Sequence, residues 1–544
     1  MADFHAEDVA VVIPTHRRAG ILDRTVSALA AQTASGFDVV VVVDGDDQAV
    51  GPLPVGRVLN QPHRGPAAAR NFGVDQSDRP LVLLLGDDII PTPGLVAAHL
   101  DAHNRHPSPE VAVLGHTEWH ADVATWPHNR WLDWSRSQFD YASIDGDRAQ
   151  WWHLYSSNVS LKRPFFLASG GFDEDFRRAA YEDIDLGYRL SQRGLDLRYN
   201  TAALAHHLHG YDWTTLTRRW HTTGVAERQM SRKHEWFQPF FHDRARRALG
   251  YDPVSPLWPA LARRSERVPT RLRRVLEERT NGWYDQQLSA PFLGGWFGPD
   301  DERELREYLG AGFQEAHLRE HTRLVDEEEE RAADEAEFYR TSEMYLYDLT
   351  MFSAWGTKQP YLAALRRLVP AGSRLLDYGC GIGTDGLRLI DEGYQVEFAD
   401  FDNPSTRYLR WRLARRGWDT QVYDVEGEVP GGFDAAYSFD VIEHVDDPWA
   451  FLAQLERRAR MVMVNLLEHD PTDTHLHRPL PVAAIVRHAA REGLLFYHRY
   501  QRRSHLLAYA TDGRVSRAQS LRCLVDGAVD VSLQRLTGLP ESIR

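Results

Sequence analysis

Three apolar runs near the N-terminus constrain the fold more than any other feature of this chain. Each run ends in polar or acidic residues: VAVVI at 9–13 before Pro14-Thr15, DVVVVV at 38–43 before Asp44, and PLVLLL at 80–85 before Gly86-Asp87-Asp88. Segments of helical character, 19–32 and 65–74, lie between the runs. Strands that are apolar throughout and alternate with helices predict a parallel sheet covered on both faces. Ligands bind at the carboxyl ends of such strands, so the polar residues predict a site there.

Length and charge limit the classes of protein that this chain can represent. Its 544 residues exceed a single core, so we expect at least two domains. A net charge of -15 argues against nucleic acid as a partner, because there is no basic excess to neutralise phosphates. No stretch approaches the roughly 18 apolar residues of a membrane span, so any membrane contact is expected to be peripheral. Two cysteines form no disulfide framework and no basic segment precedes Val9, which together predict a cytoplasmic protein.

An acidic stretch, YEDIDLGYRL at 181–190, has the spacing of a helix entrance. Apolar side chains at Ile184 and Leu186 each have a helical partner four residues on. Asp183 would lie where the unpaired N–H groups of a helix favour a carboxylate. Alone, this pattern is also typical of an N-cap followed by a solvated acidic turn.

The residues before this stretch favour a catalytic interpretation. NVSLK at 158–162 is followed by GGFDE at 170–174 and then by Glu182-Asp183. This order resembles the acceptor half of the GT-A glycosyltransferases of family 2. The resemblance implies that Asp183 is the catalytic base and that Gly171 and Glu182 lie beside the nucleotide-sugar. It extends over residues 8–235, where Arg218, Arg219 and Gly224 continue the family pattern.

The strand ends fit the same family, although aspartate and glycine after a strand are also ordinary turn residues. The resemblance implies that Pro14, Thr15 and Asp44 hold the nucleotide base, and that Arg70 and Asn71 of an Ala-Arg-Asn helix face the nucleotide. Gly86-Asp87-Asp88 resembles the DXD metal motif, but glycine replaces its first aspartate. Asp88 is therefore expected to be the main metal ligand, with Asp87 among the nucleotide-sugar contacts.

A divalent cation, Mn²⁺ or Mg²⁺, meets the chemical need of such a site. It neutralises the charge that develops on a departing diphosphate. The His-rich stretch AHHLH at 205–209 follows the acidic motif, where family 2 members place a further metal or diphosphate ligand. Alignment of the preceding residues assigns that position to His207, with His209 as the alternative.

An aromatic segment, 116–152, separates the two parts of this pattern. It contains Trp119, Trp126, Trp131, Trp134, Trp151 and Trp152. Aromatic residues among polar ones suit stacking on sugar rings, and they equally suit a cover over a core. We place the acceptor pocket near this segment.

A second alternating pattern begins at residue 374. RLLDYGCGIGTDG at 374–386 predicts a strand, a glycine-rich turn and a helix start. Glycines at 379, 381 and 383 alone also fit a dinucleotide site. The full sequence LLDYGCGIG, however, resembles motif I of the class I S-adenosylmethionine-dependent methyltransferases. The resemblance implies that Asp377, Gly379, Gly381 and Gly383 lie beside the cofactor.

Later carboxylates extend this resemblance over residues 360–512. Asp400 ends VEFAD and lies about 20 residues past the glycines, the spacing of a carboxylate that binds ribose hydroxyls; Asp402 competes for the role. The resemblance implies that Asp424 meets the adenine amino group and that Asp440 ends the fourth strand. Glu443-His444, which follows, is more often a structural feature.

These observations predict an α/β protein of two domains joined by a helical connector. We expect a GT-A domain at 1–236, a connector at 237–359, a class I methyltransferase domain with a Rossmann-like fold at 360–512, and a C-terminal tail at 513–544. The acidic run at 326–330 predicts a solvated helix face. The expected activities are inverting sugar transfer to a glycan, lipid-linked or protein acceptor, and methylation of a sugar hydroxyl in the same polysaccharide or glycoconjugate pathway. The alternative is that one domain is degenerate and binds a glycan or a partner; Gly86 is the feature that favours it.

Overall fold

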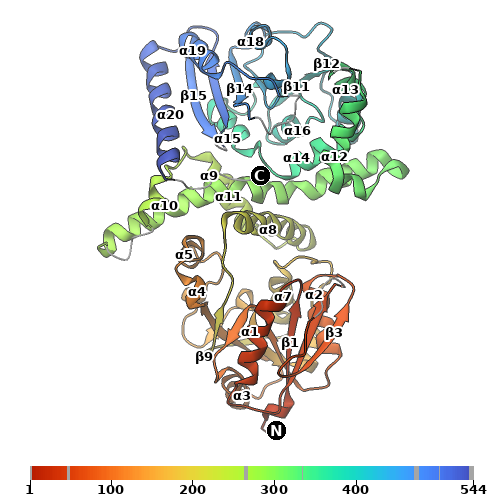
Figure 1. The fold of residues 1–544 in the computed structure, drawn as a ribbon, viewed down its shortest axis with the longest axis vertical. Coiled ribbons are helices and arrows are strands. Elements are labelled where there is room, and N and C mark those ends of the chain that lie inside the picture. The colour runs from red at the N-terminus through yellow and green to blue at the C-terminus, as the bar shows by residue number, and fades with distance from the viewer. Residues whose placement is uncertain are drawn as a thin grey trace. The chain divides into compact units, whose positions relative to one another are not determined.

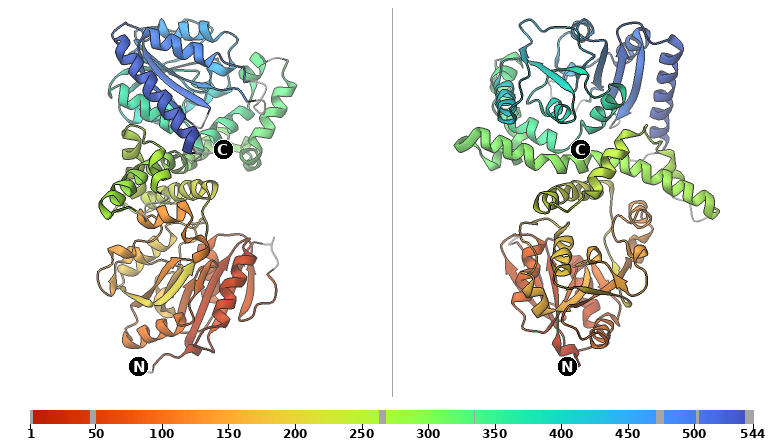
Figure 2. Two further views of the ribbon diagram at one scale, coloured as in Figure 1. Left: turned by 60° about the vertical axis from the view of Figure 1, so that its left-hand side comes forward. Right: turned by 180° about the vertical axis from the view of Figure 1, so that it is seen from behind.

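The computed structural model describes residues 3–45, 50–262, 268–333, 335–470, 477–500 and 503–537. The chain divides into two compact units, Met1–Gln238 and Pro239–Arg544, which are red to yellow and green to blue in Figures 1 and 2. The last residues of the expected tail, 538–544, lie outside the described part.

The described residues of the first unit form a nine-stranded mixed sheet of order β3-β2-β1-β4-β8-β6-β9-β5, with β7 beside β9. Strands β1 and β2 are parallel, as are β1 and β4, whereas β8 runs antiparallel to β4. The strands are β1 (Val9–Thr15), β2 (Asp38–Asp44), β3 (Arg57–Gln61), β4 (Leu81–Leu85), β5 (Ile89–Pro91), β6 (Val111–Trp119), β7 (Arg148–Ala149), β8 (Asn158–Lys162) and β9 (Asp196–His207).

Helices cover both faces of this sheet because alternate strand residues point to opposite sides. Val12 and Val42 pack with residues of α2, α6 and α7, whereas Val11 and Val41 pack with residues of α1 and α3. The main helices are α1 (Ala19–Ala30), α2 (Pro66–Asp75), α3 (Leu95–Arg105), α4 (Ala121–Ala124), α5 (Pro127–Trp134), α6 (Arg163–Ala168), α7 (Glu182–Ser191) and α8 (Trp213–Lys233).

The second unit contains a seven-stranded sheet, counted over the described residues, of order β12-β11-β10-β13-β14-β16-β15. The first five strands in that order are parallel, and β16 is antiparallel to both β14 and β15. The strands are β10 (Arg374–Tyr378), β11 (Gln395–Asp400), β12 (Val422–Asp424), β13 (Ala435–Ser438), β14 (Met461–Leu467), β15 (Leu494–Tyr500) and β16 (Ser504–Ala510). The strand order reverses between β10 and β13, which is where a doubly wound sheet binds its ligand.

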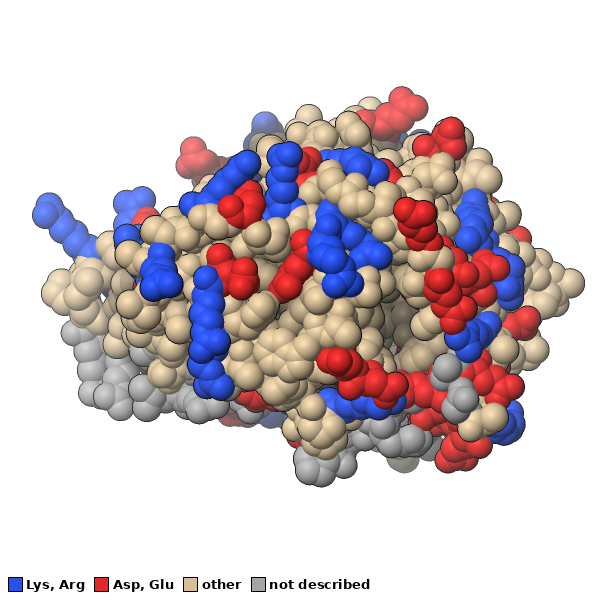
Figure 3. All heavy atoms as spheres, turned by 90° about the horizontal axis from the view of Figure 1, so that it is seen from above, with Lys and Arg blue, Asp and Glu red and all other residues tan. Residues whose placement is uncertain are grey.

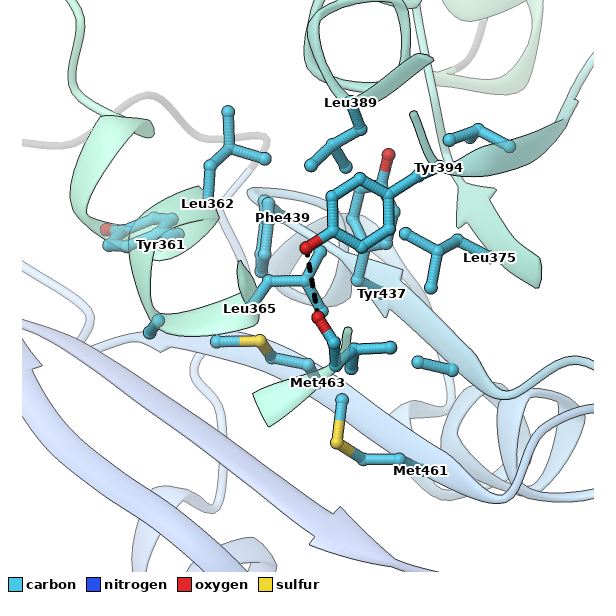
Figure 4. Close-up of a cluster of buried hydrophobic side chains, with 14 of the residues drawn as sticks. Tyr361, Leu362, Leu365, Leu375, Leu389, Tyr394, Tyr437, Phe439, Met461 and Met463 are labelled. Atoms are coloured by element: carbon cyan, nitrogen blue, oxygen red, sulfur yellow. Dashed lines mark hydrogen bonds between the residues drawn. The ribbon is translucent and has the colours of Figure 1, made fainter. Parts of the chain in front are cut away.

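Two apolar clusters hold helices against this sheet. One joins α15 (Gln359–Leu368), α16 (Thr384–Asp391) and α17 (Pro404–Arg416) to one face, and Figure 4 shows its side chains, including Leu365, Tyr437 and Met463. The dashed line in that view is the hydrogen bond from the Tyr394 hydroxyl to the carbonyl oxygen of Val369, 2.9 Å long. The other cluster joins α18 (Pro448–Glu456) and α19 (Val482–Glu492) to the opposite face.

Further helices before and after the sheet complete the second unit. They are α9 (Phe240–Gly250), α10 (Leu257–Ala262), α11 (Thr270–Leu309), α12 (Glu315–Arg331), α13 (Glu335–Thr341), α14 (Met344–Ala354) and α20 (Arg517–Thr537). Fully buried Arg412 of α17 binds Asp301 and Glu304 of α11 at 2.7 and 2.8 Å, so buried ion pairs fix α11 to α17. On the face drawn in Figure 3, acidic and basic side chains are interspersed.

The structure confirms the predicted two-sheet α/β class and the helical region between the sheets. The three apolar runs form β1, β2 and β4. Strand β3 was not predicted, because RVLNQ lacks both an apolar run and a strict alternation. Among the described helices, none has the length and hydropathy needed to cross a membrane.

Candidate functional sites

The carboxyl ends of β1 and β4 meet in the first unit because these strands are parallel neighbours. The Thr15 hydroxyl donates to Asp87 Oδ2 at 2.8 Å. Arg18, just beyond β1, donates through one nitrogen to Asp87 at 3.2 Å and to Asp88 at 2.7 Å. The pKa of Asp87 is raised to about 6 by burial and by the adjacent Asp88 carboxylate. The side chains of both aspartates that follow β4 therefore lie at the carboxyl ends of the strands, where a ligand site was predicted. Arg18 lies between them.

Asp88 and two histidines form a cluster with the donors of a metal site. Asp88 Oδ2 lies 3.4 Å from His207 Nε2 and 3.1 Å from His209 Nδ1. The three potential ligand atoms lie within 4.8 Å of one another. Pairing of Ile89 with His207 across β5 and β9, and a hydrogen bond from Leu208 N to Asp88 O, set this geometry. Burial alone would raise the pKa of Asp88, but the attraction of His207 and its hydrogen bonds lower it well below its ordinary value.

Asp44 ends β2 as predicted, but its carboxylate faces inward. Oδ1 accepts hydrogen bonds from the Gln61 side chain and Arg64 N, both at 2.8 Å; Oδ2 accepts from Gly65 N at 2.9 Å and lies 2.8 Å from His63 Nδ1. These contacts use the approximately four acceptor positions of a carboxylate. Asp44 thus holds the turn before α2, and a direct contact with a nucleotide base requires His63 to turn away.

The Ala-Arg-Asn residues of α2 connect to the acidic motif of α7. Arg70 donates to Glu182 at 3.0 Å, and both side chains are buried. Asn71 accepts a hydrogen bond from Phe172 N at 2.8 Å and donates to Phe172 O at 2.9 Å. A Cβ on Gly171, whose φ is +68°, would lie 2.6 Å from the Asn71 side-chain oxygen, so this turn requires glycine.

Asp183 lies at the second residue of α7 and is not its N-cap. The N-cap is Tyr181, which makes no side-chain cap bond and has a left-handed φ of +67°. This conformation is uncommon for a tyrosine and marks a strained position. The Tyr181 hydroxyl is anchored to Glu227 at 2.6 Å. The pKa of Asp183 is raised to about 7 by burial and by Glu182, even though Arg70 opposes the shift.

One short segment links Asp183 to the strand end that carries Asp88. The backbone of Ser156 hydrogen-bonds to the Asp183 carboxylate, and Ser157 O accepts a hydrogen bond from Gly86 N at 3.1 Å. The acidic motif of α7 and the end of β4 therefore flank the same two residues. The carboxylate with a raised pKa and the metal-type cluster lie in one region of the unit.

The aromatic segment 116–152 contains both buried and exposed rings. Trp131 is fully buried against Trp220, which is the behaviour of a core residue. Trp119 stacks on His207 with ring centroids 4.9 Å apart and an angle of 11°. Trp126 and Trp152 remain 42% and 46% exposed, so they are available to a ligand.

The glycine-rich turn of the second unit follows β10 at the point where the strand order reverses. Gly379, Gly381 and Gly383 have φ values of +78°, +51° and +70°. A Cβ on Gly383 would lie 2.3 Å from Leu409 Cδ1, and Gly381 N donates to Asp400 Oδ2 at 2.7 Å. The glycines thus allow a tight turn whose backbone is held by the end of β11.

Of the two carboxylates that compete for the ribose, Asp400 at the end of β11 faces the turn. Each of its oxygens accepts one backbone N–H, from Gly381 and Phe401, both at 2.7 Å. A carboxylate oxygen has a second acceptor position, so ribose hydroxyls could still bind. Asp402 instead pairs with Arg410 at 2.6 Å and its side chain is 57% exposed. Asp424 pairs with Asp400 in the register of β11 and β12.

Asp377 and Asp440 lie at the ends of neighbouring strands β10 and β13. The pKa of Asp377 is raised to about 8 by burial and by Asp385. Asp440 has a left-handed φ of +57°, and its carboxylate accepts a hydrogen bond from the Asn465 side chain at 2.6 Å. Lys358 Nζ lies 3.8 Å from both Asp385 and Asp440. Asp440 is thus part of the same edge as the glycine turn.

Several of these residues were not singled out from the sequence. Arg18 and Lys358 each contact two carboxylates, and His63 contacts Asp44. Lys358 could have been noticed in the sequence, because the chain has lysine only at 162, 233 and 358. Arg18 lies three residues after Thr15, at the end of a predicted strand, which is a second usable signal.

Comparison with known proteins gives matches for each part. A family model for glycosyl transferase family 2 matches residues 10–163, and one for a methyltransferase domain matches residues 350–507. Validoxylamine A glucosyltransferase of Streptomyces hygroscopicus subsp. jinggangensis is 32% identical over 230 residues, covering 36% of this chain and 54% of that protein. Ubiquinone biosynthesis O-methyltransferase of Chromobacterium violaceum is 26% identical over 149 residues, covering 22% of this chain and 64% of that protein.

A solved structure is also similar: the mannosyltransferase PcManGT from Pyrobaculum calidifontis in complex with GDP-Man and Mn²⁺, with a TM-score of 0.33, 13% identity and coverage of 68% of this chain and 89% of that one. The chain spans about half the length of the curated glucosyltransferase that it matches. The two matching family models fall in the two compact units, on either side of Gln238. The chain therefore joins a glycosyltransferase family 2 domain in its N-terminal part to a methyltransferase domain in its C-terminal part.

Proposed function

We propose that the N-terminal domain transfers a sugar from a nucleotide-sugar to a hydroxyl acceptor, with inversion, and that the C-terminal domain methylates a sugar hydroxyl from S-adenosylmethionine. The observation that carries the first activity is the position of Asp183. The pKa of Asp183 is raised to about 7, which suits a base that must be partly ionised at neutral pH. Ser156 and Ser157 connect Asp183 to the strand end that carries the Asp88 cluster.

The donor set at Asp88 fits a divalent cation. One carboxylate oxygen and two imidazole nitrogens favour a transition-metal ion such as Mn²⁺ over Mg²⁺, which prefers oxygen ligands. Such an ion would supply positive charge to a departing diphosphate. Asp88, His207 and His209 would hold it, and Arg18 would move from Asp88 toward Asp87 or the diphosphate.

In the proposed reaction Asp183 accepts the proton of the acceptor hydroxyl. The partial exposure of Asp183 gives the acceptor access to it. Attack opposite to the leaving diphosphate inverts the anomeric carbon. Glu182 and Arg70, paired at 3.0 Å, hold the entrance of α7 and set the pKa of the base.

The glycine turn of the second domain fits S-adenosylmethionine. When bound, this group supplies an electrophilic methyl carbon on a sulfonium. Asp400 would bind the ribose hydroxyls with its remaining acceptor positions, Asp424 would lie toward the adenine, and Asp377 would lie toward the amino-acid end. Positioning of the methyl group against the acceptor oxygen would supply much of the rate.

A second candidate function is a degenerate N-terminal domain that binds a glycan without transfer. Two observations favour it: Gly86 replaces the first aspartate of the metal motif, and the Arg18 guanidinium already binds Asp87 and Asp88. An arginine at that position could replace the cation.

One experiment separates the two candidates. The full chain is incubated with a panel of nucleotide-sugars, with Mn²⁺ or with a chelator, and the products are followed by mass spectrometry. Our proposal expects cleavage of one nucleotide-sugar that depends on the metal. Nucleotide-sugar binding without cleavage in either tube would support the degenerate domain.

A further inference from the structure

Besides the Asp88 cluster and the group of His16, Asp44 and His63 at the end of β2, a further cluster of metal-type ligands lies in the methyltransferase domain. Glu443, His444 and His477 offer ligand atoms that all lie within 4.8 Å of one another. Glu443 and His444 belong to the short helix η6 (Ile442–His444), which follows β13 and Asp440. The cluster is therefore beside the strand ends where the methyl donor is proposed to bind.

The Glu443 side chain is difficult to explain as ordinary packing. The residue is 1% exposed, and its Oε2 has no hydrogen-bond partner within the described part of the chain. A buried polar atom without a partner is costly, so it is expected to have a ligand or an explanation.

The basic side chains near Glu443 are engaged elsewhere. Lys358 lies 3.8 Å from Asp385 and from Asp440. Arg478 donates its backbone N–H to the Glu443 carbonyl oxygen at 2.8 Å, whereas its guanidinium binds Glu335 and Asp446. No ion pair joins either cation to the Glu443 carboxylate, although the positive charge of Lys358 acts on it from a greater distance.

The two histidines favour a metal ion over the methyl donor as the ligand of this cluster. The His444 and His477 rings lie 4.9 Å apart, and Tyr339 Oη lies 3.0 Å from His444 Nδ1. Contacts of this kind orient metal-binding histidines. Imidazole nitrogens bind metal ions through a lone pair, whereas a sulfonium or an ammonium group is matched by carboxylates such as Asp377.

We propose that Glu443, His444 and His477 bind a divalent transition-metal ion, whose open positions take the hydroxyl oxygens of the methyl acceptor. Three protein ligands of this type leave coordination positions for other molecules. Both histidines are partly exposed, so the ion and the acceptor can reach the site. The preferred acceptor carries neighbouring hydroxyls, as a sugar does, because two adjacent oxygens can chelate one ion. This inference rests on the proposed methyltransferase function for its acceptor.

Zinc binding to the full-length chain tests the site directly. A background of Asp88→Asn with His63→Gln weakens both clusters of the N-terminal unit, and Zn²⁺ bound per chain is measured by equilibrium dialysis. We expect about one equivalent in this background, and at least about tenfold weaker binding when Glu443→Gln is added. His477→Gln, at a partly exposed residue, should have the same effect if Glu443→Gln folds poorly. His488→Gln is the matched control: His488 pairs with Glu456 at 2.7 Å in the same domain but outside the cluster.

Unchanged zinc affinity in both Glu443→Gln and His477→Gln would overturn the site. Relaxation of water protons by Mn²⁺ in the same background tests the open positions; an ion without exchangeable water would overturn the acceptor role. S-adenosylmethionine binding is measured separately by calorimetry and should change less than about twofold in Glu443→Gln. A wild-type chain that binds zinc at this cluster but not S-adenosylmethionine would reject the proposed methyl transfer and keep the metal site.

Discussion

The pH dependence of sugar transfer should be set by Asp183 and tuned by Glu182. Burial and the Glu182 carboxylate raise the pKa of Asp183 to about 7, whereas Arg70 lowers it. Because a raised carboxylate pKa favours the protonated form, the base is inactive at low pH and becomes active as the pH rises through 7. Glu182→Gln removes the second contribution and leaves the Arg70 charge, so both effects move the pKa of Asp183 downward.

The size of the effect follows from the ionised fraction. With a pKa of about 7, roughly a tenth of Asp183 is ionised at pH 6, so kcat/KM there should be about a tenth of its plateau. If loss of the neighbouring charge lowers that pKa by about one unit, about half of the base is ionised at pH 6. Glu182→Gln should therefore raise the relative rate at pH 6 about fivefold. Asp183→Asn should lower the rate by ~10² to 10⁴ at every pH and remove the acidic limb.

Metal-dependent release of nucleoside diphosphate from the active nucleotide-sugar, measured from pH 5 to 9, provides the assay. Glu174→Gln is the matched control, because Glu174 lies in the neighbouring turn, pairs with exposed Arg64, and is not among the groups that shift Asp183. Circular dichroism and thermal melting check that the buried Arg70 tolerates loss of its partner. Identical midpoints for wild type and Glu182→Gln would refute the electrostatic reasoning. An acidic limb that persists in Asp183→Asn would reject Asp183 as the base.

Four further expectations test other parts of the molecule. Asp88→Asn should abolish Mn²⁺-dependent nucleotide binding and leave S-adenosylmethionine affinity intact, as calorimetry can show, because the two sites lie in separate units. Asp400→Ala should weaken S-adenosylmethionine at least about tenfold, since charge-assisted bonds contribute roughly 1.5–3 kcal/mol each, while exposed Asp402→Ala should do less; the opposite order would exchange their roles. Arg412→Met leaves Asp301 and Glu304 buried without that partner and should cost about 3–5 kcal/mol in denaturant unfolding, against about 0–1 kcal/mol for exposed Arg410→Met. If sugar transfer precedes methylation on one acceptor, labelled methyl incorporation should need nucleotide-sugar; equal labelling without it would indicate two independent reactions.

Local sequence patterns were sufficient for much of the architecture. The runs that became β1, β2 and β4 are apolar throughout, and burial on both faces of a sheet requires that composition. The glycine-rich turn after β10 was predictable because few other residues adopt its positive φ values. Strand β3 escaped prediction, since its pairing with β2 provides the order that its own five residues do not encode.

The sequence by itself determined which residue types stand at the strand ends and at the entrance of α7, and so the candidates Asp88, Asp400 and Asp183. Only the tertiary structure decided what those carboxylates contact: Arg18 lies between Asp87 and Asp88, and the acceptor positions of Asp44 are occupied by its own turn. The cluster of Glu443, His444 and His477 likewise depends on the contact between residues 477–478 and the short helix after β13, where Arg478 N donates to Glu443 O. The physical reason is the sequence distance over which each effect acts. Periodicity and turn chemistry act between neighbours in the chain. Charge pairing, burial and the pKa values they produce depend on residues that only packing brings together.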